Sequence, residues 1–167
     1  MAIYITSDTH FGHTNIIKYC KRPFKSTKDM DKIIIKNWNK IVKPDDIIWH
    51  LGDFSLTGAD RTRELVNLLN GYKILIVGNH DKKPNKMKSY GFDEVYHGIR
   101  LYDYKLLTHV PIFIEGMLTI NVGVDQWGFK PIPMPKEKRI ILSGHVHEIW
   151  KVKGYDDEKR NFKWLGE

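Results

Sequence analysis

The sequence ILIVGNHD, residues 74–81, joins four consecutive apolar residues to a polar loop. A short apolar run bounded by glycine is typical of a buried β-strand. Two upstream segments repeat this order, because the strand-like run 47–51 is followed by Gly-Asp and the run 3–7 by Asp-Thr-His. We therefore predict three buried strands, each of which ends in a loop of polar side chains.

Amphipathic helices separate these predicted strands. Apolar residues at three-to-four spacing, a serine cap and a following proline predict a helix over Ser26–Val42. Similar signals predict helices over Asp60–Asn70 and Pro84–Tyr90, each of which stops at a glycine. Strands that alternate with helices in this way favour a parallel sheet covered by helices.

The pattern changes after Gly91. Strand-like segments now follow one another, separated by glycines and by a proline-rich stretch at 131–138 that we expect to be a long loop. The segments are Phe92–Tyr96, Ile99–Thr108, Met117–Val124 and Arg139–Leu142. Their succession predicts a second, more antiparallel sheet.

Length and composition fit a single globular domain over residues 1–167. The chain is 41% hydrophobic, which is enough for a core, and its length corresponds to roughly one domain. No apolar run approaches the roughly 18 residues that cross a membrane, so we expect no membrane partner. The single cysteine, Cys20, cannot form an internal disulfide, which favours the reducing cytoplasm. The oligomeric state stays open.

The charge of the chain is basic. The 27 Lys and Arg exceed the 20 Asp and Glu, which gives a net charge of +7. This excess favours anionic partners such as phosphate esters, nucleotides or nucleic-acid fragments. Four of the lysines directly follow the loop at 78–81: Lys82, Lys83, Lys86 and Lys88. They form either a solvated helix face or an electrostatic path for an anionic substrate.

The polar loops after four apolar runs carry side chains that bind metals. These residues are Asp8, His10, Asp53, Asn79, His80, His145 and His147. Because loops at the carboxyl ends of strands gather at one place in α/β sheets, we expect these side chains to converge. Aspartate with histidine suits Mn, Fe or Zn, and the set is large enough for two ions. Each motif alone is also compatible with an ordinary turn, whereas the combination favours a metal site.

Five short motifs in this chain resemble those of the calcineurin-like metallophosphoesterases. They are Asp8-Thr-His10, Gly52-Asp53, Gly78-Asn79-His80-Asp81, the lone His109, and Gly144-His145-Val-His147. The sequence DTHFGH at 8–13 and the later Arg22-Pro-Phe are further similar to the small single-domain phosphoesterases of bacteria and their phages. The resemblance spans residues 8–147, nearly the whole chain.

The resemblance implies an α/β fold, a four-layer α/β/β/α sandwich of two mixed sheets flanked by helices. It also implies two divalent metal ions, with manganese as the expected metal and Fe, Zn or Ni as alternatives. The implied ligands are Asp8, His10 and His147 for one ion, Asn79, His109 and His145 for the other, and Asp53 as the bridge between them.

The resemblance further implies hydrolysis of a phosphate ester by a metal-bridging hydroxide. His80 would be the catalytic residue that protonates the leaving oxygen or stabilises charge on the phosphoryl group. Asn79, His13 and Arg22 would contact the substrate. The alternatives are a local hydrogen bond for His13 and a surface position for Arg22. His50 lies inside an apolar run and is expected to be a core histidine.

Substrate preference depends on the residues that follow Asp53. Protein-phosphatase branches of the family carry an Asp that orients the catalytic His, and then an Arg, where this chain has Leu56 and Thr57. A monoester carries nearly two negative charges, so the loss of this arginine favours phosphodiesters. Two other functions stay open at this point: a nuclease acting on polymeric DNA or RNA, and a non-catalytic binding module on the same fold.

Overall fold

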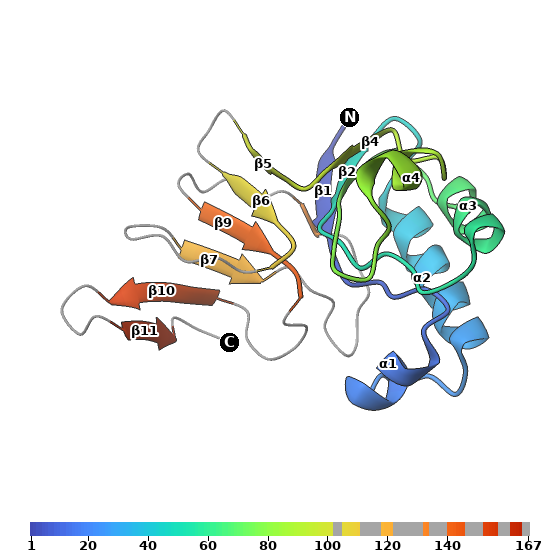
Figure 1. The fold of residues 1–167 in the computed structure, drawn as a ribbon, viewed down its shortest axis with the longest axis horizontal. Helices are drawn as coiled ribbons and strands as arrows, with labels where there is room; N and C mark the ends of the chain where they lie inside the picture. Colours follow the sequence, from blue (N-terminus) through green and yellow to red (C-terminus); the bar gives the residue numbers. More distant parts are fainter. Residues whose placement is uncertain are drawn as a thin grey trace.

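Two β-sheets pack face to face, and helices lie against the outer face of one of them in the computed structural model (Figure 1). The described residues are 1–101, 105–110, 118–121, 132–133, 140–145, 152–156 and 161–164. The two-sheet α/β architecture predicted from the sequence is confirmed.

The first sheet has the strand order β4-β3-β2-β1-β8. Its strands are β1 (Ile3–Thr6), β2 (Ile47–His50), β3 (Tyr72–Ile76), β4 (Glu94–Tyr96) and β8 (Ile132–Pro133). Strands β1, β2 and β3 run parallel, as predicted, and β8 pairs antiparallel with β1. The prediction of a loop through 131–138 is therefore wrong at the two residues of β8, which extend the sheet at its β1 edge. The assignment of Phe92–Tyr96 to the second sheet is wrong, because β4 pairs parallel with β3 and so belongs to the first sheet.

Four helices are described, and all of them precede residue 89. They are α1 (Thr14–Tyr19), α2 (Thr27–Ile41), α3 (Ala59–Leu68) and α4 (Pro84–Lys88). The hydroxyl of Ser26 accepts a hydrogen bond from the backbone N–H of Asp29 and so caps α2, as its sequence indicates. Helix α1 was not predicted, because six residues are too few for a helical period to stand out. No described helix is long and apolar enough to cross a bilayer.

The second sheet has the order β11-β10-β7-β9-β6-β5. Its strands are β5 (Gly98–Arg100), β6 (Leu106–Thr108), β7 (Leu118–Asn121), β9 (Ile140–Ser143), β10 (Val152–Asp156) and β11 (Asn161–Trp164). The sheet is mixed, since β9 runs parallel to β6 and β7 while the other neighbours are antiparallel. The predicted single strand over 99–108 is wrong: its two ends pair with each other as β5 and β6.

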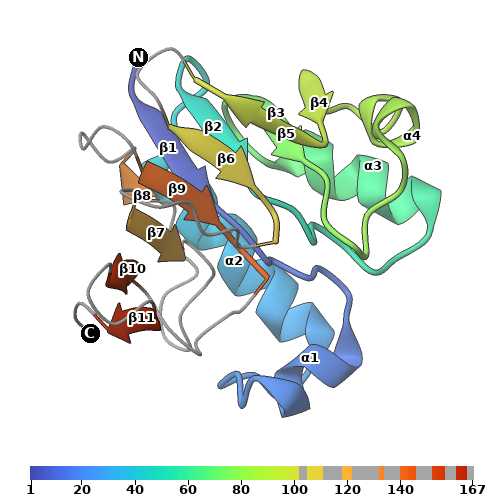
Figure 2. The same cartoon turned by 60° about the vertical axis from the view of Figure 1, so that its left-hand side comes forward.

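Alternation along the strands builds two apolar cores. Ile48 and Leu75 point toward the helices, where they pack with Trp38 and other helix residues. Their neighbours Trp49 and Ile74 point the other way, into the core between the sheets. Figure 2 shows the two sheets stacked beside α2. The described part of the chain thus contains three of the four predicted layers, since its helices all cover the first sheet.

Asp46 ties the first residues of the chain to the loop before β2. Its carboxylate accepts hydrogen bonds from the backbone N–H groups of Ala2, at 2.7 Å, and Lys43, at 2.9 Å. These two hydrogen bonds hold the pKa of Asp46 below its ordinary value. The stability that this carboxylate contributes must therefore depend on pH.

We expect Asp46→Ala to lower the Tm at pH 7 and to lower it less at pH 3. A carboxylate with a depressed folded-state pKa stabilises the fold above its unfolded pKa, about 4, and loses this effect as the pH falls through the folded-state value. Thermal unfolding followed by circular dichroism at both pH values measures the difference. The exposed neighbour Asp45, replaced by alanine, is the control. An equal change in Tm at both pH values would contradict the prediction.

Candidate metal centre

Loops from both sheets meet at one place, where the two sheets face each other. Asp8 follows β1, Asp53 follows β2, and their loops are joined by the hydrogen bond from the N–H of Asp8 to the carbonyl of Gly52. His145 follows β9, and its N–H donates to the carboxylate of Asp8. The structure brings together Asp8, His10, Asp53, Asn79, His109 and His145. The seventh predicted ligand, His147, lies outside the described residues.

Four of these residues have an unusual backbone conformation. The φ angles are +54° for Asp8, +49° for His10, +55° for Asp53 and +70° for His145. Each such conformation costs a residue with a side chain about 1–3 kcal/mol, and it persists only where surrounding contacts hold it. The strain gathers where the side chains converge, as is usual for a functional site.

Two glycines allow the loops to approach this closely. A Cβ atom at Gly78 would lie 2.2 Å from a carboxylate oxygen of Asp53, and one at Gly144 would lie 1.9 Å from the hydroxyl of Ser7. Real Cβ atoms do not come so near to other atoms. Glycine is therefore required at both positions for the loops to pack around the site.

The first ligand group consists of Asp8, His10 and Asp53, whose ligand atoms lie within 4.8 Å of one another. Nε2 of His10 is 3.9 Å from Oδ1 of Asp8 and 3.5 Å from Oδ2 of Asp53. All three residues are buried. The group offers one nitrogen and two carboxylates, a set that suits a divalent first-row metal.

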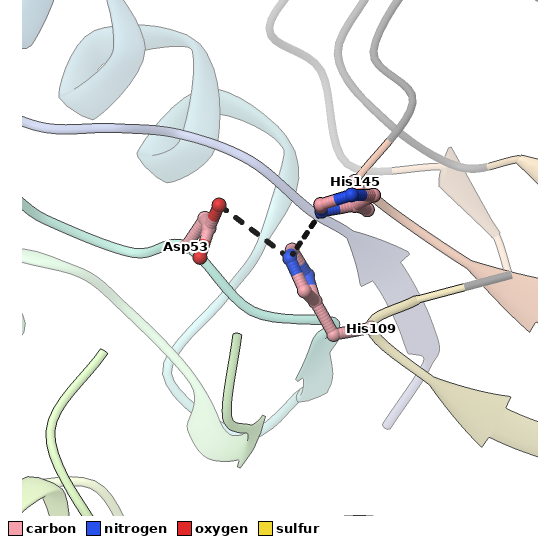
Figure 3. A group of neighbouring side chains, drawn as sticks. All are labelled: Asp53, His109 and His145. Atoms are coloured by element: carbon pink, nitrogen blue, oxygen red, sulfur yellow. Dashed lines mark hydrogen bonds and ion pairs between the residues drawn. The ribbon is translucent and has the colours of Figure 1, made fainter. Parts of the chain in front are cut away.

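The second ligand group consists of Asp53, His109 and His145, and Figure 3 shows the three side chains facing one another. Nε2 of His109 is 3.4 Å from Oδ2 of Asp53 and 3.2 Å from Nδ1 of His145. Oδ1 of Asn79 lies 3.0 Å from each of the two histidine nitrogens. Asn79 thus places a fourth candidate ligand atom beside this group.

In the second group, several hydrogen-bond acceptor atoms face one another, as they do around a bound metal ion. Nδ1 of His109 donates to the carbonyl of Leu51 at 2.7 Å, so the neutral ring has its lone pair on Nε2. That lone pair faces Oδ1 of Asn79 and Oδ2 of Asp53, which are also acceptors. Acceptor atoms at these distances repel one another unless a proton or a cation lies between them. The residues therefore fit a divalent ion, bound through nitrogen and oxygen.

Asp53 belongs to both groups. Its Oδ2 lies 3.5 Å from Nε2 of His10 and 3.4 Å from Nε2 of His109. Its Oδ1 accepts a hydrogen bond from the backbone N–H of His80 at 2.9 Å. One oxygen of the carboxylate is thus turned toward both ligand groups, while the other is anchored to the backbone.

Burial and opposite charges determine how the centre titrates. Burial raises the pKa of Asp8 to about 7. Burial acts in the same direction on Asp53. When a proton and not a metal ion lies between the two side chains, His109 is charged and donates to Asp53, and this hydrogen bond and charge hold the pKa of Asp53 well below its ordinary value. Burial lowers the pKa of His109, yet the Asp53 carboxylate reverses this, so the pKa of His109 is raised. Asp53 therefore carries the persistent negative charge of the centre.

His80 and His13 lie at the open side of this centre. Nε2 of His80 is 4.0 Å from Oδ2 of Asp53, and 42% of the side chain is exposed. Its ring is 5.5 Å from that of His10 and 6.0 Å from that of His13, centroid to centroid. Burial, together with the charges of His80 and Arg22, lowers the pKa of His13. Both rings thus lie on the side of the candidate ligand groups where the His80 side chain is exposed to solvent.

Arg22 occupies a different environment from the one that the sequence suggested. It is 5% exposed, and its guanidinium donates to the backbone carbonyls of Asp8, at 2.8 Å, and Thr9, at 3.0 Å. The guanidinium thus contacts the loop that carries the candidate ligands Asp8 and His10, and it also contacts the sulfur of Met30 in α2. This burial argues against a direct contact between Arg22 and a substrate.

Asp81 closes the predicted loop but received no role from the sequence. Its carboxylate accepts hydrogen bonds from the backbone N–H groups of Gly78, at 2.8 Å, Asp53, at 2.8 Å, and Phe54, at 3.0 Å. It therefore joins the loop after β3 to the loop that carries Asp53. An aspartate three residues after a glycine is a signal for such a backbone-binding turn, although the second loop could not be identified from the sequence.

The chain belongs to the calcineurin-like phosphoesterase family, whose sequence profile it matches over residues 1–164. The resemblance that the five motifs indicate is confirmed. The family implies metal-dependent hydrolysis of phosphate esters, and the two Asp and His groups of this structure are candidate ligands for the metals.

Individual relatives extend the comparison. The chain is 37% identical to an uncharacterized protein of Methanocaldococcus jannaschii, over 86% of this chain and 93% of that protein. It is 29% identical to the gene 66 protein of Mycobacterium phage D29, over 87% of this chain and 78% of that protein. It is also similar to the crystal structure of AQ665, a protein of unknown function from Aquifex aeolicus, with 39% identity and a TM-score of 0.54. That match covers 66% of this chain and 61% of the solved one.

Proposed function

We propose that this protein is a phosphoesterase with a dinuclear metal centre, acting in the cytoplasm. The observation that carries the proposal is the position of the Asp53 carboxylate, which faces the ligand atoms of two groups at once. A single ion would need only one of these groups. Two ions that share one carboxylate account for both.

The proposed ligands divide between two ions. They are Asp8, His10 and His147 for the first, Asn79, His109 and His145 for the second, and Asp53 for both, with manganese as the proposed metal. When bound, such a pair of ions activates water and offsets the charge that develops on the phosphoryl oxygens. The protein's own contribution is to hold the ligands in place on strained loops and to present the exposed side chains to the ester.

His80 is the proposed catalytic residue. Its backbone is fixed by the hydrogen bond to Asp53, while its partly exposed ring stands 4.0 Å from the shared carboxylate. From this position its Nε2 can protonate the leaving oxygen, or donate a hydrogen bond to a phosphoryl oxygen. His13, 3.3 Å from His10 through the two Nδ1 atoms, and Asn79 are the proposed substrate contacts.

A pocket beside His80 provides room for the alcohol part of an ester. It has a volume of about 210 Å³, and its walls include the hydroxyl residues Ser55 and Thr57 and the side chains of Met87 and Tyr90. Other branches of the family have an arginine where this chain has Thr57, so the pocket lacks that two-pronged contact for a doubly charged monoester, and its lysine, Lys82, supplies only a point charge. A diester has a single charge and an additional ester group to place. The pocket and the missing arginine both favour phosphodiesters.

We expect kcat/KM for bis-p-nitrophenyl phosphate to exceed that for p-nitrophenyl phosphate by at least roughly tenfold, which corresponds to about 1.4 kcal/mol. Both esters release the same leaving group, so the comparison isolates the second ester group. Purified protein with Mn²⁺ is assayed with each substrate, and the Asp53→Ala variant gives the background. A clear preference for the monoester would contradict the prediction.

Short oligonucleotides form a further arm of the same assay. The net charge of +7 and the exposed lysines that follow His80, namely Lys82, Lys83, Lys86 and Lys88, are compatible with a nucleic-acid substrate. Cleavage of plain DNA or RNA that falls steeply as salt increases would assign the enzyme to the nucleases. Weak cleavage with little dependence on salt would favour small diesters.

A further inference from the structure

Thr9 is the residue between two metal ligands, and its neighbours on both sides are strained. Asp8 and His10 have φ angles of +54° and +49°. Backbone bonds from the N–H groups of Asp8 and His10 to the carbonyls of Gly52 and Asp53 hold one side of this loop. Because left-handed conformations cost about 1–3 kcal/mol each, the loop needs further contacts to keep this shape.

Arg22 supplies contacts to the carbonyl side of the loop. Its two terminal nitrogens each donate to one carbonyl, NH2 to Asp8 at 2.8 Å and NH1 to Thr9 at 3.0 Å. The two carbonyls belong to consecutive residues, so the planar guanidinium fixes the peptide between them. A charged group that is 5% exposed is costly to bury, and hydrogen bonds to backbone oxygens are what offset that cost.

His50 supplies a contact to the side chain of Thr9. The Thr9 hydroxyl lies 2.8 Å from the carbonyl of Phe54 and 3.0 Å from Nε2 of His50. The hydroxyl has one proton, and the carbonyl can only accept, so this proton goes to Phe54. Nε2 of His50 must then carry a proton and donate to the hydroxyl. Among the described residues Nδ1 of His50 has no hydrogen-bond partner, which agrees with an unprotonated Nδ1.

We propose that Arg22 and His50 are positioning residues that hold Asp8 and His10 in the geometry for binding metal. Arg22 acts on the backbone of the loop, and His50 acts through Thr9, whose hydroxyl also joins this loop to Phe54, the residue after Asp53. The inference rests on the proposed metal centre, but its prediction concerns metal affinity and not hydrolysis. Loss of such supporting contacts weakens metal binding by about 10–100-fold.

The test measures the dissociation constant of Mn²⁺ by titration calorimetry on metal-depleted protein. We expect Arg22→Gln to weaken the binding of the ions by roughly 10–100-fold. Arg22→Lys keeps the charge but loses the two-pronged contact, so it should fall between Arg22→Gln and the wild type. Val66→Ala, a truncation of a fully buried side chain in α3, is the control that lowers stability away from the loop.

The His50 contact is tested by a conservative series. His50→Phe keeps a ring against Trp38 and Phe54 but removes the donor. His50→Gln keeps a donor near the Nε2 position and should restore much of the affinity. If His50 acts through Thr9, the double variant Thr9→Val/His50→Phe should bind Mn²⁺ nearly as well as Thr9→Val alone. The Thr9→Val substitution has already removed the hydrogen bond to His50, so the second substitution has no further contact to remove. Nitrogen NMR of the wild type should show His50 protonated at Nε2.

The outcomes separate this inference from the proposed function. Variants of Arg22 and His50 that bind Mn²⁺ as the wild type does, and lose only Tm as Val66→Ala does, would overturn it. So would an Arg22→Gln enzyme with normal metal affinity and a raised KM, since Arg22 would then contact the substrate. If the variants lose affinity while the loaded wild type hydrolyses no phosphate ester, the positioning role stands and the proposed function fails. A wild type that binds no divalent ion would overturn both.

Discussion

Replacing Asp53 with alanine is expected to abolish phosphoesterase activity, with a loss of about 10³-fold or more in kcat/KM. The Oδ2 atom of Asp53 faces His10 at 3.5 Å and His109 at 3.4 Å, so the substitution removes the one ligand that both groups share. Shared coordination is what keeps two ions close together, and it contributes several kcal/mol to the stabilisation of the transition state. The remaining ligands would then form two incomplete sets.

Metal content provides the direct measurement. Elemental analysis of the reconstituted wild type should find two divalent ions per chain, and Asp53→Ala should hold fewer. Asp60→Ala is the matched control, because Asp60 is an exposed aspartate of α3 that pairs with Arg63 away from the centre. No more than one ion in the wild type, or an Asp53→Ala enzyme that remains active, would show that the centre has been misassigned.

Replacing His80 with alanine is expected to lower kcat by about 10²–10⁴-fold while the metal content stays at that of the wild type. This range is the usual contribution of a positioned acid or base. The His80 ring stands 4.0 Å from Asp53 and is 42% exposed, whereas the proposed ligands Asp8, His10 and His109 are buried. The backbone N–H that donates to Asp53 is retained in the alanine variant, so the shared carboxylate keeps that anchor.

A series of diesters with different leaving groups tests the role of His80. If His80 protonates the leaving oxygen, the loss in kcat should shrink as the leaving group becomes more acidic. His97→Ala, a change at an exposed histidine between β4 and β5, should leave the rates unaltered. Loss of metal from His80→Ala would identify His80 as a ligand and contradict its catalytic assignment.

The sequence by itself determined three of the parallel strands, β1, β2 and β3, and it singled out the candidate ligands in the loops that follow them. Apolar runs at 3–7, 47–51 and 74–77 are short and bounded by turn residues, which is typical of buried strands, and the helical period of 26–42 allows that segment to cover them. Strands β1, β2 and β3 are each followed within a few residues by a loop that carries candidate ligands, so the link between strand and candidate ligand is local. A strand and the loop that directly follows it can be identified together from the sequence, because neither depends on a partner far away in the chain.

The second sheet shows where local patterns are insufficient. The apolar segment 99–108 predicts one strand, but its ends form β5 and β6, because these two strands pair with each other and β6 also pairs with β9. Pairing energy of this kind depends on partners far away in the chain, and a short apolar run does not identify its partner. Strand β8 was missed for the same reason, since two residues gain strand geometry only from contact with β1.

Tertiary structure alone decided how the site is assembled. The sequence indicates that Asp53 is a ligand, but only the packing of two sheets turns one of its oxygens toward His10 and His109 together. Nothing in the sequence around Arg22 indicates that it is buried. It is buried because the chain after α1 comes back to the loop that follows β1, where the guanidinium donates to the carbonyls of Asp8 and Thr9. The left-handed backbone at Asp8 and His10 is unfavourable for any short segment, so it exists only because distant parts of the chain hold it in place.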